Sequence, residues 1–150
     1  MDKEFFPFVG TEKDYIISTN TALPTFKEYA YDFKKERYIT DKKTNDLIIV
    51  EGKKALEVWI YHAIKTIRYE YEIYSWDYGT EIVDLVGQKF TKGLTESEAF
   101  RYIKEALLIN PYILEVKNKG ITFNGDTLKV SIKVDTIYGL IDLKGVDAYV

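Results

Sequence analysis

Residues 95–135, TESEAFRYIKEALLINPYILEVKNKGITFNGDTLKVSIKVD, decide the fold because a helix pattern is followed at once by a strand pattern. Thr95 and Glu98 form a capping box, in which each side chain can bind the backbone amide of the other residue at a helix start. Pro111 keeps Asn110 out of helical geometry. The stretch therefore predicts a helix over 95–109 with a buried stripe of Ala99, Phe100, Ile103, Ala106 and Leu107.

The pattern after this helix predicts a β-hairpin. Residues 112–123 form its first strand, and 124–126 are the turn-forming residues Asn-Gly-Asp. Apolar and polar residues then alternate over 128–135, so the second strand has one buried face, made of Leu128, Val130, Ile132 and Val134. A further strand is predicted over 139–146, and residues 145–150 are expected to form a free extension.

Another long helix is predicted upstream, over 53–67. Lys53, Glu57 and Tyr61 fall on its solvent face, opposite an apolar stripe of Leu56, Trp59, Ile60, Ala63, Ile64 and Ile67. A short helix over 80–86, a loop over 88–94 and small strands between residues 26 and 50 complete the pattern.

The order of these elements predicts an α+β fold. We expect one mixed or antiparallel sheet, packed with two long helices and one short helix, and a C-terminal β-hairpin with an extra strand. Residues 1–24 lack sustained periodicity and are interpreted as an extended N-terminal arm. Residues 25–146 are then a single domain, and 147–150 are a C-terminal extension.

Composition excludes several kinds of chemistry. The 150 residues have a net charge of −3 and include no Cys and one His, so disulfides, Cys-ligated metals and Cys nucleophiles are excluded. A mild negative charge without a basic block disfavours nucleic-acid binding. No apolar run approaches the roughly 20 residues of a membrane span. We expect a cytosolic, soluble protein with no metal, cofactor, nucleic-acid or membrane partner, and a structural role for His62.

The chain is rich in aromatic residues, with 13 Tyr, 8 Phe and 2 Trp. One core of this size cannot hide so many Tyr side chains with every hydroxyl paired, so part of them is expected on surfaces that a partner covers. The surplus is concentrated in residues 5–8, 29–38 and 69–78, which are three candidate contact surfaces.

One segment resembles the site of an enzyme. Glu70 and Glu72 would share one face of a strand, among several Tyr residues that could stack on sugar rings. Two carboxylic acids are sufficient for glycoside hydrolysis, so a peptidoglycan-cleaving, lysozyme-like glycosidase is the alternative function. Alternating Tyr and Glu also describe a charged strand face at a wet interface, and this interpretation is favoured.

The order of several motifs resembles the baseplate wedge, or sheath-initiator, family of contractile phage tails and phage-tail-like bacteriocins, in its PBSX-like prophage branch. The resemblance extends from Ala22 to Gly139. It is carried by Ala22–Phe33, Glu51-Gly52, Ala55–Ile60, Lys65–Tyr69, Tyr74–Gly79 and Asn110–Ile113. The family has Glu-Pro-Arg where this chain has Asn110-Pro111-Tyr112, so the salt-bridge role of that motif does not transfer.

The resemblance implies a structural subunit, not an enzyme, that joins wedge proteins to the tail tube. Its C-terminal sheet would accept strands from sheath subunits and initiate the sheath, in a ring of six copies. Assembly would take place in the bacterial cytoplasm, before the subunit becomes part of a phage tail or tail-like particle. The implied partner-binding residues are Arg68, Trp76, Asp77, Tyr78, Gly79, Asn110, Pro111, Tyr112, Ile141, Leu143 and Val146.

Two expectations allow a direct structural check. Arg68 could contact a neighbouring subunit or act as an internal clamp for Asp77 or Glu81, and the sequence leaves both roles open. Deletion of residues 141–150 is expected to leave the domain folded while stopping sheath polymerisation.

Overall fold

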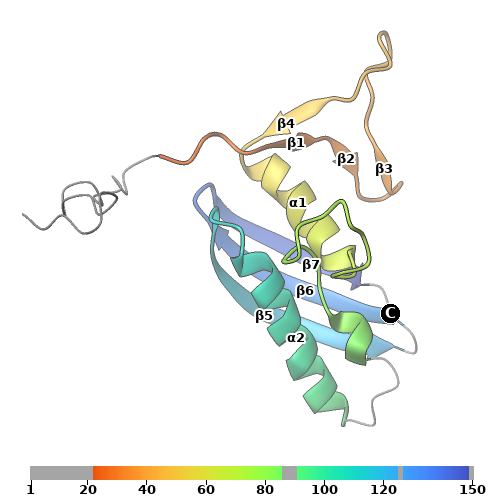
Figure 1. Cartoon of the computed structure of the whole chain (residues 1–150), viewed down its shortest axis with the longest axis vertical. Coiled ribbons are helices and arrows are strands. Elements are labelled where there is room, and N and C mark those ends of the chain that lie inside the picture. Colours follow the sequence, from red (N-terminus) through yellow and green to blue (C-terminus); the bar gives the residue numbers. More distant parts are fainter. Residues whose placement is uncertain (1–21, 86–90, 125–126, 149–150) are drawn as a thin grey trace, which may run out of the picture.

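The centre of the fold is a three-stranded antiparallel sheet with strand order β5-β6-β7. The computed structural model describes residues 22–85, 91–124 and 127–148. Helices α1 and α2 lie on the same face of this sheet (Figure 1). The elements are β1 (Lys27–Tyr29), β2 (Tyr31–Asp32), β3 (Arg37–Tyr38), β4 (Ile49–Glu51), α1 (Lys53–Lys65), η2 (Ile82–Leu85), α2 (Lys92–Leu108), β5 (Ile113–Asn124), β6 (Thr127–Thr136) and β7 (Gly139–Ala148).

The predicted hairpin is confirmed by β5 and β6. The apolar residues of β6, Leu128, Val130, Ile132 and Val134, are completely buried against the helices. The expectation that the chain leaves the sheet at Gly145 is wrong, because β7 continues to Ala148 and that residue is only 1% exposed. The alternating pattern therefore predicted the strands correctly. The end of β7 was not predicted, because the few residues after Gly145 are too short a stretch to show a clear alternation.

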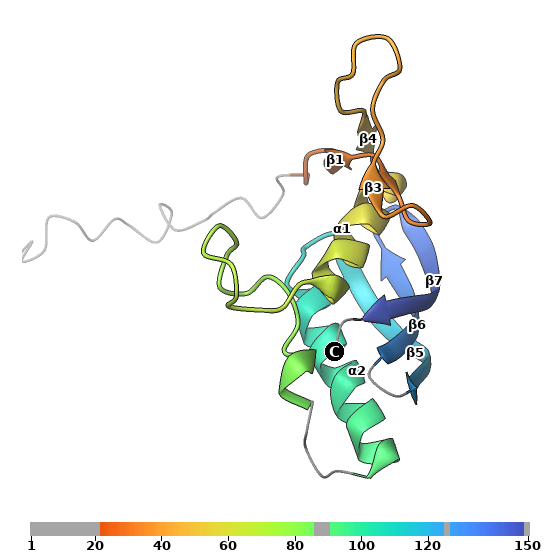
Figure 2. The ribbon, with the colours of Figure 1, turned by 90° about the vertical axis from the view of Figure 1, so that its right-hand side faces the viewer.

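The α+β class is confirmed, but the expectation of one sheet is wrong. The described residues form three separate antiparallel sheets: β1 with β4, β2 with β3, and β5-β6-β7. The two small sheets are only two strands each and cover α1, so they add a layer to the helix instead of extending the main sheet (Figure 2).

Both long helices are present with shifted ends. α2 begins at Lys92 and its N-cap is Thr91. The predicted helix start with a capping box at Thr95 is therefore wrong, and so is the predicted loop over residues 92–94. The Thr95 hydroxyl instead donates to the Thr91 carbonyl at 3.2 Å, a bond that competes with capping. The short helix predicted over 80–86 is the single 3₁₀ turn η2, and Gly87 lies outside the described residues.

Long-range hydrogen bonds fix the start of the described chain to the sheet. The Tyr112 hydroxyl donates to the Pro24 carbonyl at 2.6 Å, and the Tyr138 hydroxyl accepts from the Phe26 amide at 2.9 Å. Of the predicted N-terminal arm, residues 1–21 lie outside the described part of the chain, as does the candidate contact surface at 5–8. None of the described helices is long and apolar enough to cross a membrane.

Candidate docking surfaces

Residues 69–78, the aromatic loop, project from a closed stem at the end of α1. Ile67 and Thr80 form a parallel β-bridge. The Arg68 amide donates to the Thr80 carbonyl at 3.0 Å, and the Thr80 amide donates to the Thr66 carbonyl at 2.9 Å. These bonds bring the two ends of the loop together, so the loop extends from a fixed base.

Arg68 locks this stem from inside the molecule. Its Nη1 lies 3.0 Å from Glu81 Oε1, and its Nε donates to the Gly79 carbonyl at 3.2 Å. The Arg68 side chain is only 13% exposed. Of the two roles left open by the sequence, the internal clamp is therefore present, and its carboxylate is Glu81. A contact of Arg68 with a neighbouring subunit remains a prediction.

Gly79 is required by the geometry of the stem. Its φ of +96° is unfavourable for residues with a side chain. A Cβ atom at this position would lie 2.7 Å from the Thr66 carbonyl oxygen, which is closer than real Cβ contacts allow. Glycine therefore permits the close approach of the two stem strands.

The head of the aromatic loop exposes large apolar side chains. Ile73 is 86% exposed and Trp76 is 79% exposed. In Figure 2 the loop extends sideways from the end of α1, away from the three-stranded sheet. Exposed apolar side chains gathered on one loop are typical of a surface that a partner covers. Tyr78 is the exception, because it packs against Trp59 and Tyr74 with ring centroids 5.7 and 4.7 Å away, and burial raises its pKa.

The junction of α2 and β5 contains the Asn110-Pro111-Tyr112 motif. Asn110 is buried, and its Oδ1 accepts the Tyr112 amide at 3.0 Å. Tyr112 is also buried, and its ring stacks on Tyr138 with centroids 6.1 Å apart. Only Pro111 of the three is exposed. The side chains of Asn110 and Tyr112 thus maintain the junction, and partner contacts by this motif remain a prediction.

The three predicted partner-binding residues of β7 direct their side chains mainly toward the core. Ile141 is 1% exposed, Val146 is 8% exposed and Leu143 packs against the core cluster. Within the described residues, β7 pairs with β6 alone. Any strand added at this position would therefore bind the backbone of β7, because the apolar side chains of β7 already pack in the core.

A hollow of about 450 Å³, the edge hollow, borders β7. Consecutive residues Asp142–Asp147 line one side, and its other side is formed by Phe33, Lys34, Glu36, Tyr61 and Lys65. Successive side chains of a strand point to opposite faces of a sheet. Consecutive residues of β7 line the hollow, and a single face of the strand would supply only every second one. The hollow therefore lies along the edge of β7. No local pattern predicts this hollow, since its walls are far apart along the chain.

A polar network fixes the wall opposite β7. Lys65 pairs with Glu36, and the Tyr61 hydroxyl donates to the same Glu36 oxygen at 3.1 Å. The hydrogen bond from Lys65 lowers the pKa of Glu36. Tyr61 was predicted on the solvent face of α1, but it is 7% exposed. That prediction is wrong because the β2–β3 hairpin covers this side of the helix, as the ring contact of Phe33 with Tyr61 at 4.8 Å shows.

Glu70 and Glu72 do not lie on a strand, as was expected for a glycosidase site. The segment from Arg68 to Gly79 consists of turns and bends, so the expectation of one shared strand face is wrong. Glu70 lines a hollow with Lys65 and Ile73, whereas Glu72 lines a second hollow with Trp76. No group of three potential metal ligands occurs in the part of the chain that the structure describes.

The described residues thus include a sheet edge paired on one side only and an aromatic loop with exposed apolar side chains. The chain belongs to the contractile injection system sheath initiator family, because the family model matches residues 27–139, more than half of its length. The resemblance inferred from the motifs is therefore confirmed.

The chain is also similar to the phage-like element PBSX protein XkdS of Bacillus subtilis (strain 168). The two sequences are 34% identical over 125 residues, which cover 83% of this chain and 84% of XkdS. The family match includes the aromatic loop and the Asn110–Tyr112 junction, and it ends at Gly139, the first residue of β7.

Proposed function

We propose that this sheath initiator starts the sheath by strand addition at the free edge of β7. The observation that carries the proposal is the edge hollow, in which Asp142–Asp147 lie opposite the Phe33–Glu36 turn and α1. An extended segment of a sheath subunit lying there would pair with β7 and lengthen the three-stranded sheet. Each added backbone hydrogen bond contributes about 0.5–1.5 kcal/mol, so the contact would strengthen with each residue of the added strand that pairs.

The edge carries a feature that limits unwanted pairing. The register between β6 and β7 shifts between Val130 and Ile132, and Gly145 has a φ of +60° at this bulge. The Gly145 amide donates to the Ser131 hydroxyl at 3.0 Å, which fixes the bulge. Bulges twist an edge strand and restrict which segments can pair with it. The bulge would thus favour a matching sheath segment over nonspecific aggregation.

We further propose that the aromatic loop and the Pro111 junction contact the wedge proteins and the tail tube. The loop is supported by its clamped stem, and Ile73 and Trp76 give it the exposed apolar area that interfaces bury. A closed ring of six copies around the tube would then present its β7 edges to the first ring of sheath subunits. In this proposal the chain assembles in the bacterial cytoplasm and remains in the tail or tail-like particle.

We propose no catalytic activity for the chain. Its two candidate acids, Glu70 and Glu72, line different hollows, and a sheath-initiating role needs no bond cleavage. Incubation of the purified chain with peptidoglycan tests this part of the proposal. We expect no release of soluble sugars, and release that disappears in Glu72→Gln would overturn it.

The structural role is tested on baseplates assembled without this chain. We expect such baseplates to bind sheath subunits poorly and to form no extended sheath. Addition of the purified chain should restore extended sheaths that start at the baseplate. Sheaths of normal length that grow from baseplates lacking the chain would contradict the proposed function.

A further inference from the structure

The aromatic loop forms a small hollow of its own, the loop hollow. Four rings and one carboxylate line it, together with Ser75: Tyr69, Tyr71, Tyr74, Trp76 and Glu72. The rings of Tyr69 and Trp76 have centroids 5.9 Å apart, and those of Tyr71 and Tyr74 are nearly perpendicular at 85°. Aromatic rings have electron-rich faces and electropositive edges, so a cation in such a space is attracted to the faces.

All charged side chains of the loop around this hollow are negative. The segment 69–80 contains Glu70, Glu72 and Asp77 and no Lys or Arg. Among the described residues, none provides a cationic group within ion-pairing distance of these three carboxylates. The nearest basic residues in sequence are engaged elsewhere, Lys65 with Glu36 and Arg68 with Glu81. The loop therefore offers negative charge and aromatic rings together.

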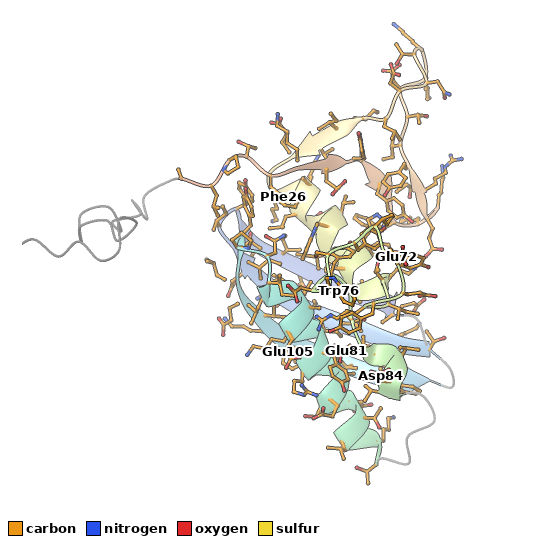
Figure 3. The ribbon with its side chains drawn as sticks, viewed as in Figure 1. Phe26, Glu72, Trp76, Glu81, Asp84 and Glu105 are labelled. Carbon is orange, nitrogen blue, oxygen red and sulfur yellow. The ribbon has the colours of Figure 1, made fainter. Side chains whose placement is uncertain are left out.

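We propose that the loop hollow binds an arginine side chain of a baseplate partner. A cation is attracted to aromatic faces, and a planar guanidinium can stack on a ring while it donates to a carboxylate. Glu72 would accept the hydrogen bonds, and Trp76 would provide the largest stacking surface (Figure 3). The inference rests on the proposal that the aromatic loop docks a partner, and it names the chemistry of that contact.

The size of the hollow supports a single side chain as the occupant. Its volume of about 230 Å³ is below the range of roughly 300–1,000 Å³ that small-molecule pockets occupy. The same chemistry occurs within the chain, where the Arg101 guanidinium lies 4.6 Å from the centroid of the Tyr102 ring and also pairs with Glu98. The loop hollow has the ring and the acid of that arrangement without the cation.

The test uses the isolated, full-length chain and two model compounds. N-acetyl-argininamide carries the guanidinium, and N-acetyl-citrullinamide has nearly the same shape without charge. In amide and indole NMR spectra we expect saturable shifts of Trp76 and of residues 69–75 with the arginine compound, with a Kd on the order of 10 mM. The citrulline compound should shift these signals at least about fivefold less at equal concentration.

Three variants separate the site from the rest of the loop. Trp76→Leu and Glu72→Gln should each weaken arginine binding by about fivefold or more, whereas Glu70→Gln, which alters the other hollow, should change it by less than about twofold. Equal shifts with both compounds, unchanged affinity in Trp76→Leu, or no saturable shift would overturn the inference. Because no sheath or baseplate is present, these results are independent of whether the chain initiates a sheath.

Discussion

Arg68 Nη1 lies 3.0 Å from Glu81 Oε1, and this ion pair closes the stem that carries the aromatic loop. Both side chains are largely shielded from water, with 13% and 29% of their surfaces exposed. The Arg68 Nε also donates to the Gly79 carbonyl. One guanidinium thus joins the two sides of the stem, from the end of α1 to the residue before η2.

The first prediction concerns the stability of this stem. Arg68→Met should lower the free energy of unfolding by about 2 kcal/mol, because it leaves the Gly79 carbonyl and Glu81 without their charged donor. In a double-mutant cycle with Glu81→Gln, the coupling energy should be about 1 kcal/mol. Urea denaturation of the four proteins measures both quantities.

Arg101 provides a matched control for this experiment. It also forms ion pairs, with Glu98 and Glu105, but its side chain is 49% exposed on the surface of α2. Arg101→Met should have little effect on stability, because exposed pairs contribute little in water. A larger loss in Arg101→Met than in Arg68→Met would contradict the role assigned to the stem.

The second prediction uses two glycines in different surroundings. Gly79→Ala should destabilise the fold by about 2–4 kcal/mol, because it combines a φ of +96° with a Cβ atom 2.7 Å from the Thr66 carbonyl oxygen. Gly93 lies in the first turn of α2 with no heavy atom near its Cβ position. Gly93→Ala should stabilise the protein by about 0.5–1 kcal/mol. Thermal denaturation distinguishes the two, and a Gly79→Ala variant as stable as the natural chain would disprove the close approach.

The third prediction concerns pH. His62 lies 4.5 Å from the Tyr31 ring and 5.8 Å from the Tyr38 ring, measured between centroids, and burial lowers the pKa of His62. Because the folded state then binds a proton less readily than the unfolded state, stability is complete above about pH 6.5. The free energy of unfolding should fall as pH decreases below that value, until the folded-state pKa is reached.

The single histidine makes this prediction easy to check. Urea denaturation between about pH 7.5 and 5.5 should show the decrease in the natural chain and a much flatter profile in His62→Phe. Phenylalanine keeps a ring among Tyr31 and Tyr38 and cannot titrate. An equal slope in both proteins would mean that other groups cause the pH dependence.

Local patterns in the sequence predicted much of the fold. The alternation in β6 and the apolar stripe of α2 are strong because each element buries one continuous face. The start of α2 was missed because both Thr91 and Thr95 can begin a helix, and only the structure shows that the Thr95 hydroxyl binds the Thr91 carbonyl. The small strands between residues 26 and 50 were predicted, but their pairing into two separate sheets was not, because strands of two or three residues carry almost no periodic signal.

The candidate surfaces were predictable only in part. The aromatic loop was apparent from its composition, since Tyr and Trp cluster there without an apolar period. The clamp between Arg68 and Glu81 was one of the open alternatives. By contrast, the burial of Tyr61 depends on a hairpin far away in sequence, and the edge hollow depends on the same hairpin. Contacts of this kind arise from tertiary packing, so no local pattern could indicate them.

The structure also changes the way in which the C-terminal strand must be tested. Deletion of residues 141–150 was expected to leave the domain folded, but it would remove Ile141 and Ala148, each 1% exposed, from the core. The β6–β7 turn has two central residues, between the paired Thr136 and Gly139. Hydrogen-bonded and non-hydrogen-bonded pairs alternate from such a turn, so Asp142 is expected to direct its amide toward the free edge.

Proline at position 142 is therefore the sharpest substitution for the central claim. Asp142→Pro removes one backbone donor from the free edge, and proline is tolerated on edge strands. Asp142→Ala is the matched control, since it also removes the ion pair with Lys119 but keeps the amide. Circular dichroism and thermal denaturation show whether each variant is folded. If Asp142→Pro does not fold, Lys144→Pro, at another exposed position of β7, replaces it.

The most direct measurement is the length and number of sheaths that grow on baseplates containing each variant, counted by electron microscopy. We predict that baseplates with Asp142→Ala start extended sheaths as the natural chain does, whereas those with folded Asp142→Pro start few or none. Normal sheaths on baseplates that carry a folded proline variant would contradict strand addition at the β7 edge.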